Sequence, residues 1–121
     1  MAKILIVDDE KPILRMYSEA LTGHDIILAE NGDEGLKMAS KEQPDIILLD
    51  IIMPQVNGLD VLEKLKNDRD TSGIPVIILT NLPEEASADK AKALGAVAYY
   101  VKAQYDPEKL AEIVNKTLGK K

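Results

Sequence analysis

Short runs of aliphatic residues alternate along the chain with longer stretches in which apolar residues recur every three or four positions. The runs are ILIV, IILA, IILL, VIIL and AVAYYV, at residues 4–7, 26–29, 46–49, 76–79 and 96–101. Each run has the length and composition of a buried strand. The stretches after them have the period of an amphipathic helix, as Leu59, Leu62 and Leu65 illustrate in the third. The pattern therefore predicts five strands, each followed by a helix.

Residues that typically begin or end helices stand at the borders of these stretches. Pro12 fits the first turn of the first helix, where a missing backbone N–H costs nothing. Gly23 and Gly95 fit positions just after helices. The sequence DPE at 106–108 offers a cap, a proline and an acid, and it predicts the start of the last helix.

The alternation of strands and helices also predicts the fold class. Strands joined by helices are parallel in most proteins, because a right-handed crossover returns the chain to the same edge of the sheet. Runs that are apolar on both sides fit a sheet covered by helices on both faces. We therefore expect an α/β protein with a five-stranded parallel sheet between two layers of helices. Ligand sites in such sheets lie beyond the carboxyl ends of the strands, near the point where strand order reverses.

Composition narrows the function mainly by exclusion. A chain of 121 residues with 45% hydrophobic content can form one domain with a substantial core. It has no cysteine for disulfides or thiolate metal sites, and no basic leader followed by a long apolar segment, so we expect a cytoplasmic protein without a membrane partner. The charge is 15 − 21 = −6, with the basic residues spread among acids. Direct binding to nucleic acid is not expected.

Polar residues follow four of the predicted strands, at the end where sites form in this fold class. They are Asp8, Asp9 and Glu10 after the first strand, Asp50 after the third, Thr80 and Asn81 after the fourth, and Lys102 after the fifth. Any one of them alone fits an ordinary loop or cap; Asp9, for instance, could cap the first helix. Together, acids, a hydroxyl and a lysine at one edge of a sheet predict a functional site.

The chemistry of this site follows from its charges. Carboxylates crowded together repel one another unless they are protonated or bind a cation. Mg²⁺ prefers oxygen ligands and typically binds through one or two carboxylates plus phosphate oxygens. A cation beside Asp50, with Lys102 and Thr80 nearby, suits the acceptance of a phosphoryl group. We therefore interpret Asp50, an acid at the end of an otherwise apolar strand, as the nucleophile.

The motifs ILIVDDE, IILLDIIMPQVNG, VIILTN and AYYVKA, in this order and spacing, resemble the receiver domain of bacterial two-component response regulators. The resemblance covers essentially the entire chain and implies a flavodoxin-like (βα)5 fold for one receiver domain over residues 1–121. It implies that Asp50 takes a phosphoryl group from a sensor histidine kinase or phosphotransfer protein. Such a domain is not a turnover enzyme in the usual sense, because it catalyses only its own phosphorylation and slow dephosphorylation.

The resemblance also implies roles for the residues around the aspartate. The ligands of Mg²⁺ would be Asp8, Asp9, Asp50 and the backbone carbonyl of Ile52. Thr80 would turn its hydroxyl toward the bound phosphoryl group, and Lys102 would pair with that group. Tyr99 falls at the position of the family's switch aromatic, whose side chain moves inward when the threonine is recruited.

Two features depart from the family pattern. Ala103 follows Lys102 where receivers usually have a proline in a cis peptide. We expect this bond to be cis because the lysine must be aimed at the aspartate, although a cis bond before a residue other than proline costs about 2.5 to 4 kcal/mol. Ile52 and Leu82, two positions beyond the aspartate and the threonine, are apolar and cannot hold an attacking water. They predict a long-lived phosphorylated state.

Two other functions fit parts of the sequence. A receiver-like module that binds partners without phosphorylation is the main alternative, and the intact set of acids and lysine argues against it. A small phosphatase with an aspartyl-phosphate intermediate is a further alternative. It would have its nucleophile on the first strand and a second acid two residues later, and the sequence VDDEKP does not supply the rest of that motif. His24, the only histidine, is interpreted as a loop residue. The sequence leaves open whether this is a stand-alone receiver or part of a longer regulator, what its downstream target is, and whether phosphorylation produces a dimer.

Overall fold

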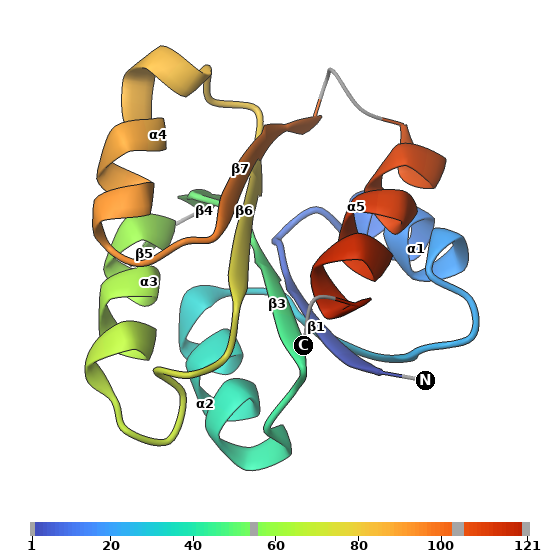
Figure 1. Ribbon diagram of the computed structural model, residues 1–121, viewed down its shortest axis with the longest axis horizontal. Coiled ribbons are helices and arrows are strands. Elements are labelled where there is room, and N and C mark those ends of the chain that lie inside the picture. The colour runs from blue at the N-terminus through green and yellow to red at the C-terminus, as the bar shows by residue number, and fades with distance from the viewer. Residues whose placement is uncertain (1, 54–55, 103–105, 120–121) are drawn as a thin grey trace.

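The computed structural model describes residues 2–53, 56–102 and 106–119 of the chain. Five strands form one parallel sheet in the order β2-β1-β3-β6-β7 (Figure 1). These strands are β1 (Lys3–Val7), β2 (Asp25–Ala29), β3 (Ile46–Leu49), β6 (Val76–Thr80) and β7 (Ala98–Val101). The predicted sheet is confirmed, and its last strand begins two residues later than the run at 96–101 suggested.

Five helices follow these strands and cover both faces of the sheet. They are α1 (Lys11–Ala20), α2 (Gly32–Glu42), α3 (Gly58–Asn67), α4 (Glu84–Ala93) and α5 (Pro107–Gly119). Figure 1 shows α1 and α5 on one face and α2, α3 and α4 on the other. None of the helices in the described parts of the chain is both long enough and apolar enough to cross a bilayer.

The core consists of two clusters of buried side chains, one on each face of the sheet. Alternate residues of β1 point to opposite faces, so that Ile4 and Ile6 join one cluster while Leu5 and Val7 join the other. Because both faces are covered, neither set of positions can be polar. This explains why the strands appear in the sequence as continuous aliphatic runs.

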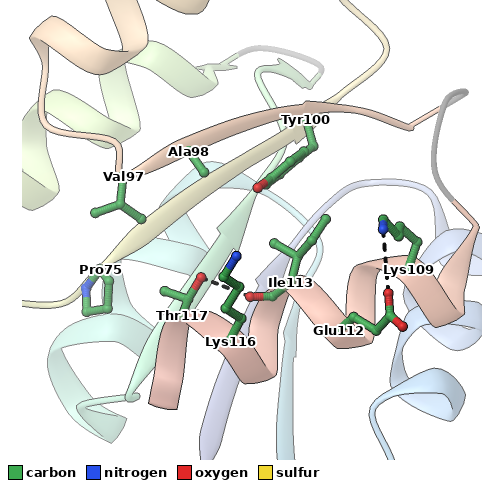
Figure 2. A pocket seen from close by; sticks show the side chains of 9 residues that line it. All are labelled: Pro75, Val97, Ala98, Tyr100, Lys109, Glu112, Ile113, Lys116 and Thr117. Atoms are coloured by element: carbon green, nitrogen blue, oxygen red, sulfur yellow. Dashed lines mark hydrogen bonds and ion pairs between the residues drawn. The ribbon is translucent and has the colours of Figure 1, made fainter. Parts of the chain in front are cut away.

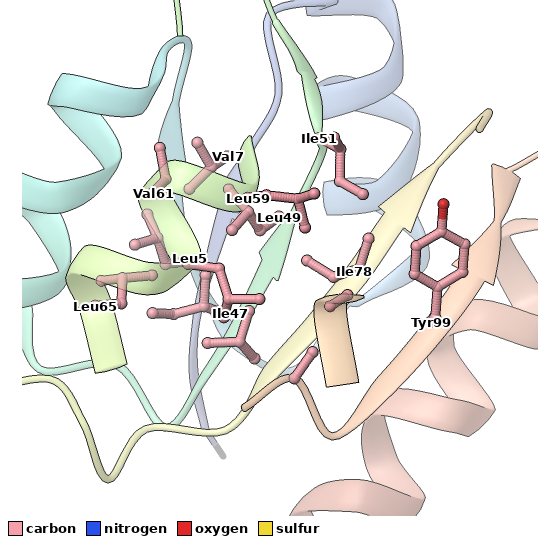
Figure 3. Close-up of a cluster of buried hydrophobic side chains, with 14 of the residues drawn as sticks. Leu5, Val7, Ile47, Leu49, Ile51, Leu59, Val61, Leu65, Ile78 and Tyr99 are labelled. Carbon is pink, nitrogen blue, oxygen red and sulfur yellow. The ribbon is translucent and has the colours of Figure 1, made fainter. Parts of the chain in front are cut away.

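The larger cluster lies on the face covered by α2, α3 and α4. Figure 3 shows Leu59, Val61 and Leu65 of α3 within this cluster, with the Tyr99 ring of β7 at one end of it. Removing a large aliphatic side chain from water contributes roughly 1.5 to 3 kcal/mol. This cluster therefore holds α3 firmly against the sheet beside the segment that follows β3.

Three of the predicted helix boundaries have the expected residues. Pro12 lies in the first turn of α1, and the Asp106 carboxylate accepts a hydrogen bond from the Lys109 amide at 2.9 Å at the start of α5. Gly95 follows the end of α4 with a φ of 109°, a conformation that favours glycine. Asp9 does not cap α1, because the N-cap residue is Glu10, whose side chain makes no capping hydrogen bond.

The loop after α1 contains His24, which is a loop residue as predicted and also joins two segments. Its Nδ1 accepts a hydrogen bond from the Ala2 amide at 3.1 Å, and its Nε2 lies 2.8 Å from Oδ1 of Asn115 in α5. An Nδ1 that accepts leaves the proton of a neutral ring on Nε2. His24 therefore links the start of β1 to α5.

A two-stranded antiparallel pair, β4 (Ile52–Met53) and β5 (Val56–Asn57), lies between β3 and α3. The sequence pattern did not predict it, because two-residue strands are too short to show a period. The chain then folds back closely: the Gly58 amide donates to the Ile51 carbonyl at 2.8 Å. A Cβ at Gly58 would lie 2.2 Å from the Asp50 carbonyl oxygen. Only glycine fits at this position.

The order of the strands reverses between β1 and β3. From β1 the chain passes to β2 at one edge of the sheet and then crosses to β3 on the other side of β1. A reversal of this kind leaves a crevice beyond the carboxyl ends of the two strands. Asp8 follows β1 and Asp50 follows β3, so both acids lie at this crevice.

Substitution of Gly58 tests the close approach of the chain to Asp50. We expect Gly58→Ala to lower the free energy of unfolding by roughly 1 to 3 kcal/mol, the usual cost of forcing extra atoms into a packed site. Gly73→Ala is the matched control, because nothing lies within 4 Å of the added methyl group. Urea unfolding followed by circular dichroism measures both. Equal midpoints for the two variants would contradict the steric role of Gly58.

Candidate functional site

Three carboxylates meet beyond the ends of β1 and β3. Asp8, Asp9 and Asp50 each offer an oxygen, and these oxygens all lie within 4.8 Å of one another. The Asp8 amide donates to Ala29 O and the Asp50 amide to Val7 O, both at 3.0 Å, so the ladder of the sheet continues one residue beyond each strand. Asp8 and Asp50 are 2% and 4% exposed. The hydrogen bonds of the sheet therefore fix the backbone positions of both buried acids.

Lys102, which follows β7, reaches across the sheet edge to the acids. Its Nζ lies 2.5 Å from Asp8 Oδ2 and 2.9 Å from Asp50 Oδ2. Glu10 Oε1 is a third partner at 3.4 Å. The Lys102 and Asp8 side chains are almost completely buried, and so is that of Asp50. Lysine and acids that are distant in the sequence thus form one ion-paired cluster.

The environment shifts the pKa values of this cluster. Burial raises the pKa of the Asp8 carboxyl above its ordinary value, and hydrogen bonds from Lys102 and the Glu10 amide oppose this effect without cancelling it. Burial acts to lower the pKa of Lys102, but hydrogen bonds to Asp8 and Asp50, with the charges of both, outweigh it and raise that pKa. Lys102 therefore remains an ammonium group at neutral pH. One ammonium group faces several carboxylates, so the cluster has too little positive charge to balance its acids.

Asp50 lines a hollow that opens to solvent. The hollow has a volume of about 300 Å³ and is lined by Asp9, Glu10, Asp50, Ile52 and Asn81. The Ile52 amide donates to Asp50 Oδ1 at 3.1 Å, while Ile52 as a residue is 54% exposed. Asp50 is thus buried by its neighbours yet accessible from one side. Of the two apolar residues that the sequence analysis singled out, Ile52 lines the hollow and Leu82 packs against the core.

Thr80 and Tyr99 are both buried, and both form a hydrogen bond with the backbone of Leu82, in the loop after β6. Thr80 Oγ1 accepts a weak hydrogen bond from the Leu82 amide at 3.4 Å. The Tyr99 hydroxyl donates to the Leu82 carbonyl at 3.0 Å and lies 2.7 Å from Ser87 Oγ in α4. Tyr99 is only 6% exposed, so its side chain is turned inward in this structure. Leu82 lies between the threonine and the tyrosine.

Sequence reasoning missed two contacts of this site. Glu10 was noted as an acid after the first strand but given no role, although it contacts Lys102. Ser87 gave no signal, because a serine within a helix is ordinary, and only the fold brings its hydroxyl to Tyr99. The peptide between Lys102 and Ala103, which we predicted to be cis, lies outside the described residues.

The donor set of the three aspartates fits a hard divalent cation. Carboxylate oxygens are the ligands that such ions prefer, and an open site leaves positions for water and phosphate oxygens. Each carboxylate oxygen of Asp8 and Asp50 has one hydrogen-bond donor on it and retains a further lone pair. A cation here would offset the excess of negative charge.

A second groove, of about 630 Å³, lies between β7 and α5 (Figure 2). Pro75 and Val97 line it and precede β6 and β7, so the groove lies toward the amino ends of the strands, opposite the acids. On the α5 side, Lys109 pairs with Glu112 at 3.6 Å. The groove contains neither the aspartate cluster nor Lys102, and we assign the site to the smaller hollow.

Comparison with known proteins identifies the class of the chain. The sequence profile of the response regulator receiver domain matches residues 4–115. The chain therefore belongs to this family, whose members are phosphoacceptors in two-component signalling.

Individual relatives support this assignment. Protein PilH of Pseudomonas aeruginosa is 40% identical in an alignment that covers 98% of this chain and 99% of PilH. The alkaline phosphatase synthesis transcriptional regulatory protein PhoP of Bacillus subtilis is 37% identical in an alignment that covers 83% of this chain and 42% of PhoP. The chain thus spans nearly all of one relative and under half of the other.

Solved structures share the fold. The CheY-like receiver domain protein of Methanospirillum hungatei superposes with a TM-score of 0.91 at 30% identity, over 99% of this chain and 95% of that one. The chemotaxis protein CheY4 of Vibrio cholerae gives a TM-score of 0.88 at 30% identity, over 96% of this chain and 98% of CheY4.

Removing the lysine tests the energetics of the ion-paired cluster. In a buffer with a chelator and no divalent cations, we expect Lys102→Met to lower the free energy of unfolding by about 3 to 5 kcal/mol, because two buried carboxylates lose their cation. Adding Asp8→Asn should recover part of the loss. Lys64→Met, at an exposed position of α3, is the control and should change little. Urea unfolding measures all three variants, and a wild-type midpoint for Lys102→Met would refute this account of the cluster.

Proposed function

We propose that residues 1–121 act as one receiver domain whose phosphoacceptor is Asp50. The observation that carries this proposal is the position of Asp50, which lines an open hollow and has Lys102 Nζ 2.9 Å from its Oδ2. A carboxylate held beside an ammonium, and open on one side, can meet a phosphorus atom from solvent or from a docked protein.

The proposed transfer has a simple balance of bonds. An oxygen of the Asp50 carboxylate forms a bond to phosphorus while the bond from phosphorus to the donor breaks, and the donor leaves with the electron pair. When the donor is a phosphohistidine, the leaving group is the imidazole nitrogen. Lys102 can exchange its contact with the carboxylate for one with a phosphoryl oxygen, where it neutralises charge in the transition state.

The residues proposed to hold Mg²⁺ are Asp8, Asp9 and Asp50, with the backbone carbonyl of Ile52. When bound, Mg²⁺ would supply positive charge to the phosphoryl oxygens and reduce the repulsion between the donor and the acids. The convergence of the three carboxylates supports this assignment. Asp8 would thus serve two cations, with its Oδ2 on Lys102.

The site also supports a route by which phosphorylation would reach the surface. In this proposal Thr80 exchanges its weak 3.4 Å hydrogen bond with the Leu82 amide for one with a phosphoryl oxygen. Leu82 would shift with it, and the Leu82 carbonyl is the acceptor of the Tyr99 hydroxyl. Because Tyr99 is already turned inward, the proposed switch moves the loop between β6 and α4 rather than first burying the ring. Ser87 of α4 would share in this change through its contact with Tyr99.

Partners follow from the class of the domain. We propose that a sensor histidine kinase or phosphotransfer protein in the cytoplasm supplies the phosphoryl group. The output is proposed to be a protein target or an effector domain, reached by a phosphorylation-dependent change of surface that includes dimerisation as one outcome. Long-lived phosphorylation stays a prediction, supported by the apolar Ile52 side chain at the hollow, which offers no hydrogen bond to an attacking water.

Substitution of the aspartate tests the proposed phosphoacceptor. With a small phosphodonor and Mg²⁺, we expect the wild-type protein to gain the mass of one phosphoryl group and Asp50→Asn to gain none, because an amide is a poor nucleophile. Asp60→Asn, at an exposed position in the first turn of α3, should behave as the wild type. Intact-protein mass spectrometry gives the result, with circular dichroism to verify folding. Phosphorylation of Asp50→Asn at the wild-type rate would refute the assignment.

Thermal unfolding tests the proposed metal site without any phosphodonor. A cation that binds only the folded state stabilises it by mass action, by about 2.7 kcal/mol at a concentration 100 times the dissociation constant. We expect MgCl₂ to raise the melting temperature of the wild type relative to KCl of equal ionic strength. Asp9→Asn should reduce the increase, because it removes a ligand without removing a partner of Lys102. An identical melting temperature in both salts would contradict the site.

A further inference from the structure

The third contact of Lys102 suggests a role for Glu10. An ammonium group has three N–H donors, and carboxylates of Asp8, Asp50 and Glu10 lie within 2.5, 2.9 and 3.4 Å of Lys102 Nζ. Glu10 is the most exposed of the three acids, with 53% of its side chain accessible. Its backbone amide donates to Asp8 Oδ1 at 3.0 Å, which fixes the start of this side chain beside the cluster.

Glu10 also determines the charge met by a molecule that enters the hollow. Among the described residues, five line the hollow; three of them are the acids Asp9, Glu10 and Asp50, and none of these five is basic. Lys102, the cation of the cluster among the residues that the structure describes, is buried and turned toward its carboxylate partners. A phosphodonor in solution is an anion, so its approach is opposed by this charge. Mg²⁺ is proposed to neutralise Asp9 and Asp50. The negative charge of Glu10 would remain when the metal is bound.

We propose that Glu10 is a specificity-determining residue that discriminates against free phosphodonors of high negative charge. It acts in two ways: its half-exposed carboxylate repels a donor that enters the hollow, and its contact with Lys102 Nζ helps to keep the ammonium group among the acids. This proposal rests on the proposed function of Asp50 as phosphoacceptor. Donors that carry less charge are opposed less, because the repulsion scales with the charge of the donor.

Two small phosphodonors that differ in net charge can test whether the effect of Glu10 depends on the charge of the donor. With acetyl phosphate, a dianion at neutral pH, the Asp50 oxygen bonds to phosphorus, the bond from phosphorus to the acetyl oxygen breaks, and acetate leaves. With phosphoramidate, whose protonated nitrogen lowers its net negative charge by one, the bond from phosphorus to nitrogen breaks and ammonia leaves. Both reactions give the same aspartyl phosphate.

The experiment compares the wild type with Glu10→Gln and Glu63→Gln. Each substitution replaces an acid by its neutral isostere, and Glu63 lies at an exposed position of α3 outside the site. Initial rates of phosphorylation are measured by mass spectrometry with each donor at matched ionic strength, and the series is repeated with added KCl. Thermal melts across a MgCl₂ titration establish that Mg²⁺ is saturating for each variant.

We expect Glu10→Gln to accelerate phosphorylation by acetyl phosphate about threefold to tenfold, the scale of one removed charge at close range. The acceleration should be smaller with phosphoramidate, and it should decrease with added KCl because salt screens exposed charges. Glu63→Gln should leave both rates unchanged. A role of Glu10 in folding alone would change both donors equally and would not depend on salt.

Three results would overturn the proposal: equal acceleration with both donors, no acceleration with acetyl phosphate, or the same acceleration in Glu63→Gln. If the wild type and every variant fail to gain a phosphoryl group from either donor, the proposed function of Asp50 fails and the role of Glu10 fails with it. If Asp50 is phosphorylated at rates that do not depend on Glu10, only the role of Glu10 fails.

Discussion

The ion pairs of Lys102 with Asp8 and Asp50 join three strand ends that are distant in the sequence. The lysine follows the edge strand β7, whereas the acids follow β1 and β3 in the centre of the sheet. Buried charges such as these are tolerated only when they are paired with opposite charges. A single buried carboxylate or ammonium would lose its hydration with no ion pair to compensate for it. The cluster therefore requires all these strands to be parallel and in register, since only then do their carboxyl ends meet.

The fold and the site differ in how much of them the sequence reveals. The strands were predictable because both faces of the sheet are buried, which leaves continuous aliphatic runs, and the meeting of Asp8, Asp50 and Lys102 followed from parallel strands. The contact between Glu10 and Lys102 joins residues 92 positions apart and depends on side-chain reach, which no local pattern encodes. The β4–β5 pair is too short for periodicity, and Ser87 becomes relevant only through the packing of α4 on β7.

A chain of hydrogen bonds connects the site to the helix layer. Thr80 bonds to the Leu82 amide, the Leu82 carbonyl accepts from Tyr99, and the Tyr99 hydroxyl contacts Ser87 of α4. The first of these bonds, at 3.4 Å, is the longest, and the contact with Ser87, at 2.7 Å, is the shortest. The end of the chain nearest the acids is thus the easiest to rearrange, while the end at α4 is held tightly.

The close approach at Gly58 bears on the entropy of the reaction proposed for Asp50. With the Gly58 amide bonded to the Ile51 carbonyl and the backbone of Asp50 against Gly58, the main chain on either side of the carboxylate has little freedom. The Ile52 amide further restricts the side chain through its bond to Oδ1. Orientation of a nucleophile is a large part of a reaction barrier when it must be achieved during the encounter. Here folding has already restricted the orientation of the nucleophile. The entropy lost in the encounter is therefore mainly the translational and rotational entropy of the donor.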